Sequence, residues 1–167
     1  MSETHTAASG PRAAGSDPVV RLARLARLAR LARLRRSSLS VVAMLIVEFV
    51  LGMIYNLYGT APTSTKSIGL FSSPDLALHV VLGILLFLAA IGQLVQAIRI
   101  RHALSLWLSA VGLLSILGAG FAGLGYTGSG ANSASLGMSL AFATALACYV
   151  ILAVALPSPG VARSSTT

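Results

Sequence analysis

The chain has 167 residues, of which 56% are hydrophobic and only 10% are charged, and its formal net charge is +8. Soluble domains carry about 25% charged residues, so this composition excludes an ordinary water-soluble globular domain and indicates that lipid covers much of the surface. Seven of the twelve basic residues cluster within 21–36, beside the first long apolar segment, which indicates a membrane rather than a nucleic-acid partner.

The N-terminal region divides into a polar tail and a basic repeat. Residues 1–20 lack an apolar period and predict a disordered tail. Residues 21–38 repeat Arg-Leu-Ala, which favours helix, but a period of three turns successive arginines by about 60° around a helix, so no apolar face persists. We expect a juxtamembrane helix whose charge either binds anionic lipids or only holds the N-terminus inside. The lipid-binding candidates are Arg21, Arg24, Arg27, Arg30, Arg33, Arg35 and Arg36.

The first membrane span is predicted at 39–58. Twenty apolar residues cover about 30 Å as a helix, which matches the hydrocarbon core of a bilayer. The segment is longer than the apolar region of a signal peptide, about 7–15 residues, so we interpret it as an uncleaved anchor. Glu48 lies at its middle.

Three further spans follow at 76–98, 104–125 and 134–156, and a polar tail at 157–167 ends the chain. Ser73-Pro74-Asp75 is typical of a helix start, with an N-cap serine, a proline in the first position and an acidic first turn. The sequence therefore predicts an all-α polytopic membrane protein, with residues 39–156 forming a four-transmembrane-helix bundle.

The orientation of the bundle is predicted from its basic residues. With four spans, both termini lie on one side, and ten Lys and Arg residues near the spans fall on that side, against Lys66 on the other. The positive-inside rule then predicts both termini in the cytoplasm. The abundance of Ala, Gly, Leu and Arg is typical of a GC-rich bacterial gene, so we expect the inner (cytoplasmic) membrane.

Small residues recur at helical spacing within the predicted spans and allow helices to approach closely. They predict either packing within one bundle or a dimerisation face between two copies. The helix-packing candidates are Gly52, Gly83, Gly112, Ala119, Gly123 and Gly137.

Polar residues inside lipid are costly and are candidates for function. We estimate that Asn56 and His79 lie at the same depth, with Tyr55 close by. Glu48 is expected about 12 Å deeper, out of reach of His79, as a protonated acid bonded to Ser115 or Thr144. The intramembrane polar candidates are Glu48, Asn56, His79, Gln93 and Tyr55.

His79 permits three interpretations. It can be a structural histidine, a proton relay or substrate contact, or an axial ligand of a b-type haem, for which Met53, Met138 or a second subunit would supply the second ligand. No cofactor is expected unless the haem alternative holds.

The position of Glu48 resembles that in the small multidrug resistance exporters, where a mid-membrane glutamate on the first of four helices binds protons and cationic drugs in turn. This resemblance implies a proton-coupled transporter. It rests on Glu48 and the number of helices, whereas the loop at 59–73 is longer than the turns of those exporters and the flanking sequence matches their motif poorly.

A second resemblance covers residues 40–125. The segments Glu48-Phe49-Val50-Leu51-Gly52-Met53, Tyr55-Asn56-Leu57 and His79-Val80-Val81-Leu82-Gly83 are similar to those of uncharacterised small four-helix membrane proteins of GC-rich bacteria. This resemblance implies the fold and no activity.

The sequence contains no phosphate-binding loop, no metal-spaced Cys/His set and no Ser/His/Asp arrangement, so we expect no catalytic or metal-binding residues and no enzyme. The leading hypothesis is a small non-enzymatic membrane protein, accessory to a membrane complex or self-associating. The alternatives are a proton-coupled small-molecule transporter that uses Glu48 and a haem- or quinone-linked redox protein that uses His79.

Overall fold

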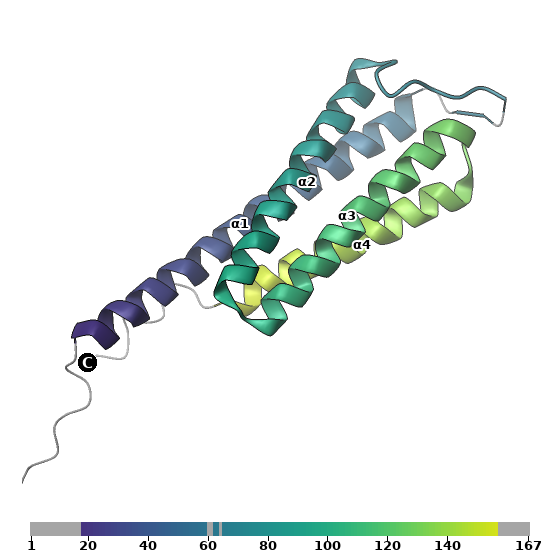
Figure 1. The fold of residues 1–167 in the computed structure, drawn as a ribbon. Coiled ribbons are helices and arrows are strands. Elements are labelled where there is room, and N and C mark those ends of the chain that lie inside the picture. The colour runs from purple at the N-terminus through teal and green to yellow at the C-terminus, as the bar shows by residue number, and fades with distance from the viewer. Residues whose placement is uncertain (1–17, 60–61, 64, 157–167) are drawn as a thin grey trace, which may run out of the picture.

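The structure is a computed structural model that describes residues 18–59, 62–63 and 65–156. Within this part of the chain it contains four α-helices, and each is long and apolar enough to cross a membrane. The all-α prediction is therefore confirmed. Of the tails predicted at 1–20 and 157–167, residues 1–17 and 157–167 lie outside the described residues, and residues 18–20 belong to a helix. The helices are α1 (Pro18–Tyr58), α2 (Pro74–Ile100), α3 (Ala103–Ser129) and α4 (Asn132–Ala155) (Figure 1).

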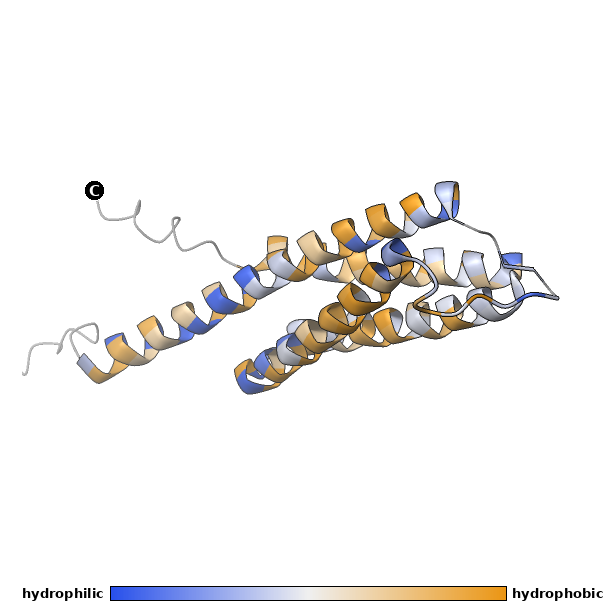
Figure 2. Cartoon of the chain, turned by 90° about the horizontal axis from the view of Figure 1, so that it is seen from above, coloured by the Kyte–Doolittle hydropathy of each residue, from blue (hydrophilic) through white to orange (hydrophobic). Residues whose placement is uncertain are grey.

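Helix α1 joins the basic repeat and the first apolar segment in one uninterrupted helix of 41 residues. At about 1.5 Å per residue it is roughly twice as long as a hydrocarbon core is thick. Its first part, residues 18–30, extends beyond the other helices as an arm (Figure 1). Exposed basic and apolar residues alternate along this arm (Figure 2), as a period of three requires.

The start of α2 is as predicted. The Ser73 hydroxyl accepts a hydrogen bond from the Leu76 amide at 3.4 Å, and Pro74 is the first helical residue. Helix α3 continues to Ser129, four residues beyond the prediction, so the polar loop expected at 126–133 shortens to a tight turn. The helix tolerates these small polar residues because the hydroxyls of Thr127 and Ser129 donate to carbonyls one turn back.

Each helix packs against two others, in the cyclic order α1, α2, α3, α4, and within the described residues no diagonal pair of helices brings its Cα atoms within 8 Å. We call the end that carries the 59–73 segment and the α3–α4 turn the loop end, and the end with the α2–α3 turn the turn end. Helices α2 and α3 lie close at the turn end and diverge toward the loop end (Figure 1).

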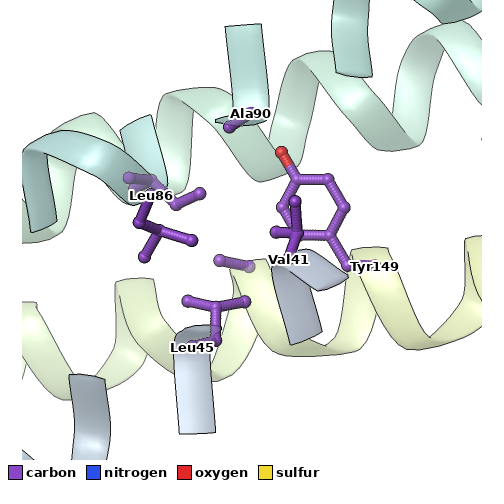
Figure 3. Packing of buried hydrophobic residues seen from close by; sticks show 7 residues of the cluster. Val41, Leu45, Leu86, Ala90 and Tyr149 are labelled. Atoms are coloured by element: carbon purple, nitrogen blue, oxygen red, sulfur yellow. The ribbon is translucent and has the colours of Figure 1, made fainter. Parts of the chain in front are cut away.

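The apolar core occupies the half of the bundle nearer the turn end. Tyr149 of α4 is fully buried and lies across the cluster, with its hydroxyl on the side of Ala90 (Figure 3). A second cluster closer to the turn end brings Leu34 of α1 against Leu152 and Leu156. The first cluster consists of Val41, Leu45, Leu86, Ala90, Ile116, Ala145 and Tyr149.

Helices α1 and α2 form one helical hairpin, and α3 and α4 form a second. The segment between α1 and α2 contacts the second hairpin. The Ile68 amide donates to the Thr127 carbonyl of α3 at 3.0 Å. Gly130, the C-cap of α3, adopts φ +66°, and a Cβ built there would lie 2.4 Å from the Pro62 carbonyl oxygen. This contact and the left-handed conformation both require glycine. The segment therefore ties the two hairpins together at the loop end.

Candidate functional site

Two glycines at the α1–α2 interface make room for the two ionisable side chains of the site. A Cβ at Gly52 of α1 would lie 3.4 Å from the His79 ring, and a Cβ at Gly83 of α2 would lie 3.0 Å from Oε1 of Glu48. Each glycine thus faces the ionisable residue of the opposite helix.

This arrangement brings Glu48 and His79 together, and the prediction that they are too far apart in depth is wrong. Glu48 Oε1 lies 3.2 Å from His79 Nδ1. The sequence-based estimate set His79 level with Asn56, eight residues and about 12 Å from Glu48 along the helix axis. In the structure, His79 lies level with Gly52 and Glu48 lies level with Gly83. Glu48 and His79 are therefore offset by one helical turn, about 6 Å. Two long side chains bridge one turn. The partner of Glu48 is therefore His79 rather than Ser115 or Thr144.

The pair is largely but not completely shielded. The side chain of Glu48 is 13% exposed and that of His79 is 26% exposed. Oε2 of Glu48 is buried and has no hydrogen-bond partner among the described residues, and the Nδ1–Oε1 contact does not have the geometry of an aligned hydrogen bond. A pair of this kind that holds one titratable proton, on either the acid or the imidazole, is neutral as a whole, and neutrality limits the cost of burial in an apolar setting.

The pair faces a cavity of about 610 Å³ between the two hairpins, in the loop half of the bundle. At the end nearer the turn end, the cavity is closed by Leu45, Leu86 and Ile116 of the apolar cluster. Tyr126 and Ser135 line it near the loop end. A volume of this size is typical of small-molecule sites, which also combine apolar walls with a few polar groups.

Of the other predicted polar residues, Tyr55 and Asn56 line the same cavity. Gly52 faces the His79 ring, with Glu48 one turn before it and Asn56 one turn after it on α1. The contact of His79 at 3.2 Å is with Glu48, and the predicted approach of Asn56 to His79 stays a prediction. Met53 and Met138, considered as haem ligands beside His79, also line this cavity.

Gln93 lies elsewhere, in a second polar layer within the turn half. Its amide Nε2 donates to the Ser38 hydroxyl, which in turn donates to the Leu34 carbonyl at 3.0 Å. Ser38 was not among the predicted intramembrane polar residues, because it lies just before the span predicted at 39–58.

Two further buried groups were also missed. Ser109 Oγ and Tyr149 Oη are fully buried and lack a hydrogen-bond partner among the described residues, as does Oε1 of Gln93. Gly112 could have indicated the position of Tyr149, because a Cβ there would lie 2.8 Å from the tyrosine ring.

The predicted packing residues fall into two groups. Gly112 is buried against Tyr149, and Gly123 and Gly137 lie close to Met138 and Ala122 across the α3–α4 interface. Ala119 and Gly123 also line the cavity, so the stripe of small residues on α3 serves packing at one end and the cavity at the other.

The basic residues of α1 differ in their surroundings. Arg35 donates from Nε to the Ala153 carbonyl of α4 at 3.0 Å and is partly buried. The remaining six are exposed or partly exposed along α1, four of them in the arm: Arg21, Arg24, Arg27, Arg30, Arg33 and Arg36. The structure thus assigns Arg35 a packing contact that the others do not share.

Comparisons with known proteins return no matching family model, no similar curated protein and no similar solved structure. The two resemblances noted in the sequence gain no support from them.

Proposed function

We propose that this protein is a small, non-enzymatic, multi-pass protein of the bacterial cytoplasmic membrane with both termini in the cytoplasm. Ten basic residues on the terminal side against Lys66 on the other support this orientation. The loop end would then face outward, and the arm of α1 would emerge among the headgroups of the inner leaflet, where its arginines can contact anionic lipids. Reporter domains fused after Thr167 should be cytoplasmic, and those inserted between Thr63 and Lys66 external; the reverse would refute this topology.

We further propose that the protein binds a lipophilic small molecule in the cavity beside Glu48 and His79. The observation that carries this proposal is that the acid–histidine pair faces a cavity of about 610 Å³ instead of packed side chains. Ionisable groups inside a membrane protein that face a cavity are typical of substrate pathways and proton relays. This placement favours a binding role of the kind that a proton-coupled transporter uses over a purely structural accessory.

The test uses cysteine accessibility. Ser139 and Leu140 of α4 are both exposed, but Ser139 lines the cavity and Leu140 does not. With Cys148 replaced by alanine, we expect a water-soluble thiol reagent to modify Ser139→Cys and not Leu140→Cys. Three probes of similar shape and different charge are then added: tetraphenylphosphonium, triphenylphosphine oxide and tetraphenylborate.

Slowing of Ser139→Cys modification by at least one probe, about tenfold at saturation, would support a binding cavity. If none of the three probes slows the reaction, the cavity does not bind lipophilic molecules and the proposed function fails.

A further inference from the structure

The polar residues that line the cavity gather at its loop end. The cavity reaches about 20 Å into the bundle, because its deepest lining residue on each helix lies 13 residues from the loop end of that helix. Within three residues of the loop end, α1, α3 and α4 each contribute neutral hydroxyl or amide side chains to the lining. These side chains belong to Tyr55, Asn56, Tyr126, Thr127 and Ser135. The polar part of a ligand therefore finds its hydrogen-bond partners at the loop end.

The deeper part of the cavity is apolar. Eight or more residues from the loop end, the described lining residues are apolar or glycine, with the exception of Glu48. The Glu48 carboxylate contacts His79 at 3.2 Å, and its Oε2 is buried. No Lys or Arg lines the cavity in the described part of the chain. The deep part thus suits an apolar chain, and the loop end offers no charged partner to an ionic head.

The two long sides of the cavity differ. On the side between α1 and α4, Phe49 stacks on Phe142 with the ring centroids 5.2 Å apart. On the opposite side, α2 and α3 diverge toward the loop end (Figure 1). Lining residues of these two helices, such as Ile84 and Phe121, are 56% and 65% exposed. A chain from surrounding lipid can therefore reach the cavity between α2 and α3.

We propose that the ligand of this cavity is an uncharged amphiphile with a single apolar chain, such as a monoacylglycerol, whose chain points to the apolar cluster and whose head lies at the loop end. This inference rests on the proposed binding function and specifies its ligand class. A volume of about 610 Å³ lies within the range of small-molecule sites, about 300–1,000 Å³, and suits one chain rather than a two-chain lipid.

The proposed membrane placement supports the orientation of the ligand. With the loop end outward, polarity in the cavity changes with depth as it does in the outer leaflet, and a depth of about 20 Å is close to half of a bilayer with its headgroup layers. An amphiphile can therefore pass from lipid to cavity without turning over. Because apolar surface gains little by leaving lipid, selectivity should depend on the head and on the fit of the chain.

The experiment uses the full-length protein in vesicles of dioleoylphosphatidylcholine, with Ser139→Cys as the reporter in the Cys148→Ala background. Ser139 lies seven residues from the loop end of α4, at a level that a bound chain would cover. Three probes share a dodecyl chain: monododecanoylglycerol is uncharged, dodecyl phosphate is an anion and dodecyltrimethylammonium is a cation. Triphenylphosphine oxide is uncharged but compact. We expect monododecanoylglycerol to slow modification at a mole fraction in the membrane at least tenfold lower than the other three.

Two glycines of α3 form a matched pair that tests the position of the chain. A Cβ at Gly118 or at Gly120 meets no atom within 4 Å, and both residues are exposed, but Gly120 lines the apolar part of the cavity and Gly118 does not. Gly120→Leu should weaken protection by monododecanoylglycerol at least tenfold, because its side chain occupies the path of the chain. Gly118→Leu should leave protection unchanged, and equal effects of the two substitutions would contradict the proposal.

The orientation is measured with the cavity residues intact. A monododecanoylglycerol analogue with a photoreactive diazirine at the end of its chain should label the level of Ala145, and one with the diazirine beside the ester should label the level of Ser135. The reverse pattern, or equal protection by a charged probe or by triphenylphosphine oxide, would overturn the amphiphile assignment and leave the binding function standing. Failure of every probe, including tetraphenylphosphonium and tetraphenylborate, would overturn both.

Discussion

The two halves of the bundle solve the same packing problem differently. In the turn half, side chains from all four helices meet in one cluster of buried residues around Tyr149. In the loop half, the α1–α2 and α3–α4 hairpins diverge around a cavity, and the buried residues described there are Tyr55, Pro62 and Leu76. The apolar floor separates a pair of ionisable residues from the neutral polar layer of Ser38 and Gln93.

Under the function proposed above, this difference divides stability and ligand binding between the two ends of a bundle that lies in a membrane. Lipid offers little gain for burying apolar surface, so helices in a membrane are held mainly by close packing. The turn half supplies that packing, which allows the loop half to keep an open space and a polar pair. Functional sites often contain ionisable groups and looser packing than the rest of a protein, and both features lower its stability.

The largest effect should follow from emptying the packed half. Tyr149→Ala removes the largest fully buried side chain and should lower the free energy of unfolding by about 2–4 kcal/mol. Phe121→Ala, at a 65% exposed cavity residue, should cost less than about 1 kcal/mol. Unfolding in mixed micelles measures both, and equal losses would contradict the division between the halves.

The next largest effect concerns the acid–histidine pair. Glu48→Leu or His79→Leu alone leaves one polar group without its partner and should cost about 1–3 kcal/mol. The double variant should cost less than the sum of the two, with a coupling energy of at least about 0.5 kcal/mol. Additive losses would mean that the 3.2 Å contact does not exist in the membrane.

A smaller effect tests how the loop end is tied together. Gly130→Ala must place a side chain at φ +66° against the Pro62 carbonyl, and should cost about 1–2 kcal/mol. Gly128→Ala is the matched control, because its Cβ meets nothing within 4 Å. Hydrogen exchange at the Ile68 amide, which bonds to Thr127, should accelerate in the first variant only; equal exchange rates would argue against the crossing.

The smallest effects distinguish the two interface glycines. Gly52→Ala makes an ordinary contact at 3.4 Å with His79, and the gain in helix propensity should make it neutral or stabilising by up to about 1 kcal/mol. Gly83→Ala brings a methyl group to 3.0 Å from Glu48 Oε1 and should displace the carboxylate. Protection of Ser139→Cys by a probe that binds the cavity should therefore weaken in Gly83→Ala and persist in Gly52→Ala. The opposite result would contradict the facing of Gly83 toward Glu48 and of Gly52 toward His79.

Much of the fold could be predicted from the sequence, because composition and helix-cap chemistry are local signals. The tripeptide Ser73-Pro74-Asp75 predicted a helix start, and α2 begins at Pro74 with Ser73 as its N-cap. His79, Gly83 and Gln93, which the sequence offered as candidates, lie on the face of α2 that packs on α1.

The register of α1 against α2 could not be predicted in the same way. Helix α1 has 41 residues, and the limits of its apolar segment do not show where it packs against α2. The prediction took Glu48 as the middle of the span, which misplaced α1 relative to His79 of α2 by one helical turn. The cavity was also missed, because the spacing of Ala119 and Gly123 is the same whether they face a neighbouring helix or an open space.

The measurement that tests the central claim most directly compares two serines, each changed to cysteine in the Cys148→Ala background. Ser139 lines the cavity in the loop half, and Ser109 is fully buried in the turn half. Applied from outside to sealed membranes, a charged thiol reagent should modify Ser139→Cys at least a hundredfold faster than Ser109→Cys. Similar rates at both positions would contradict an open, water-accessible loop half above a closed turn half.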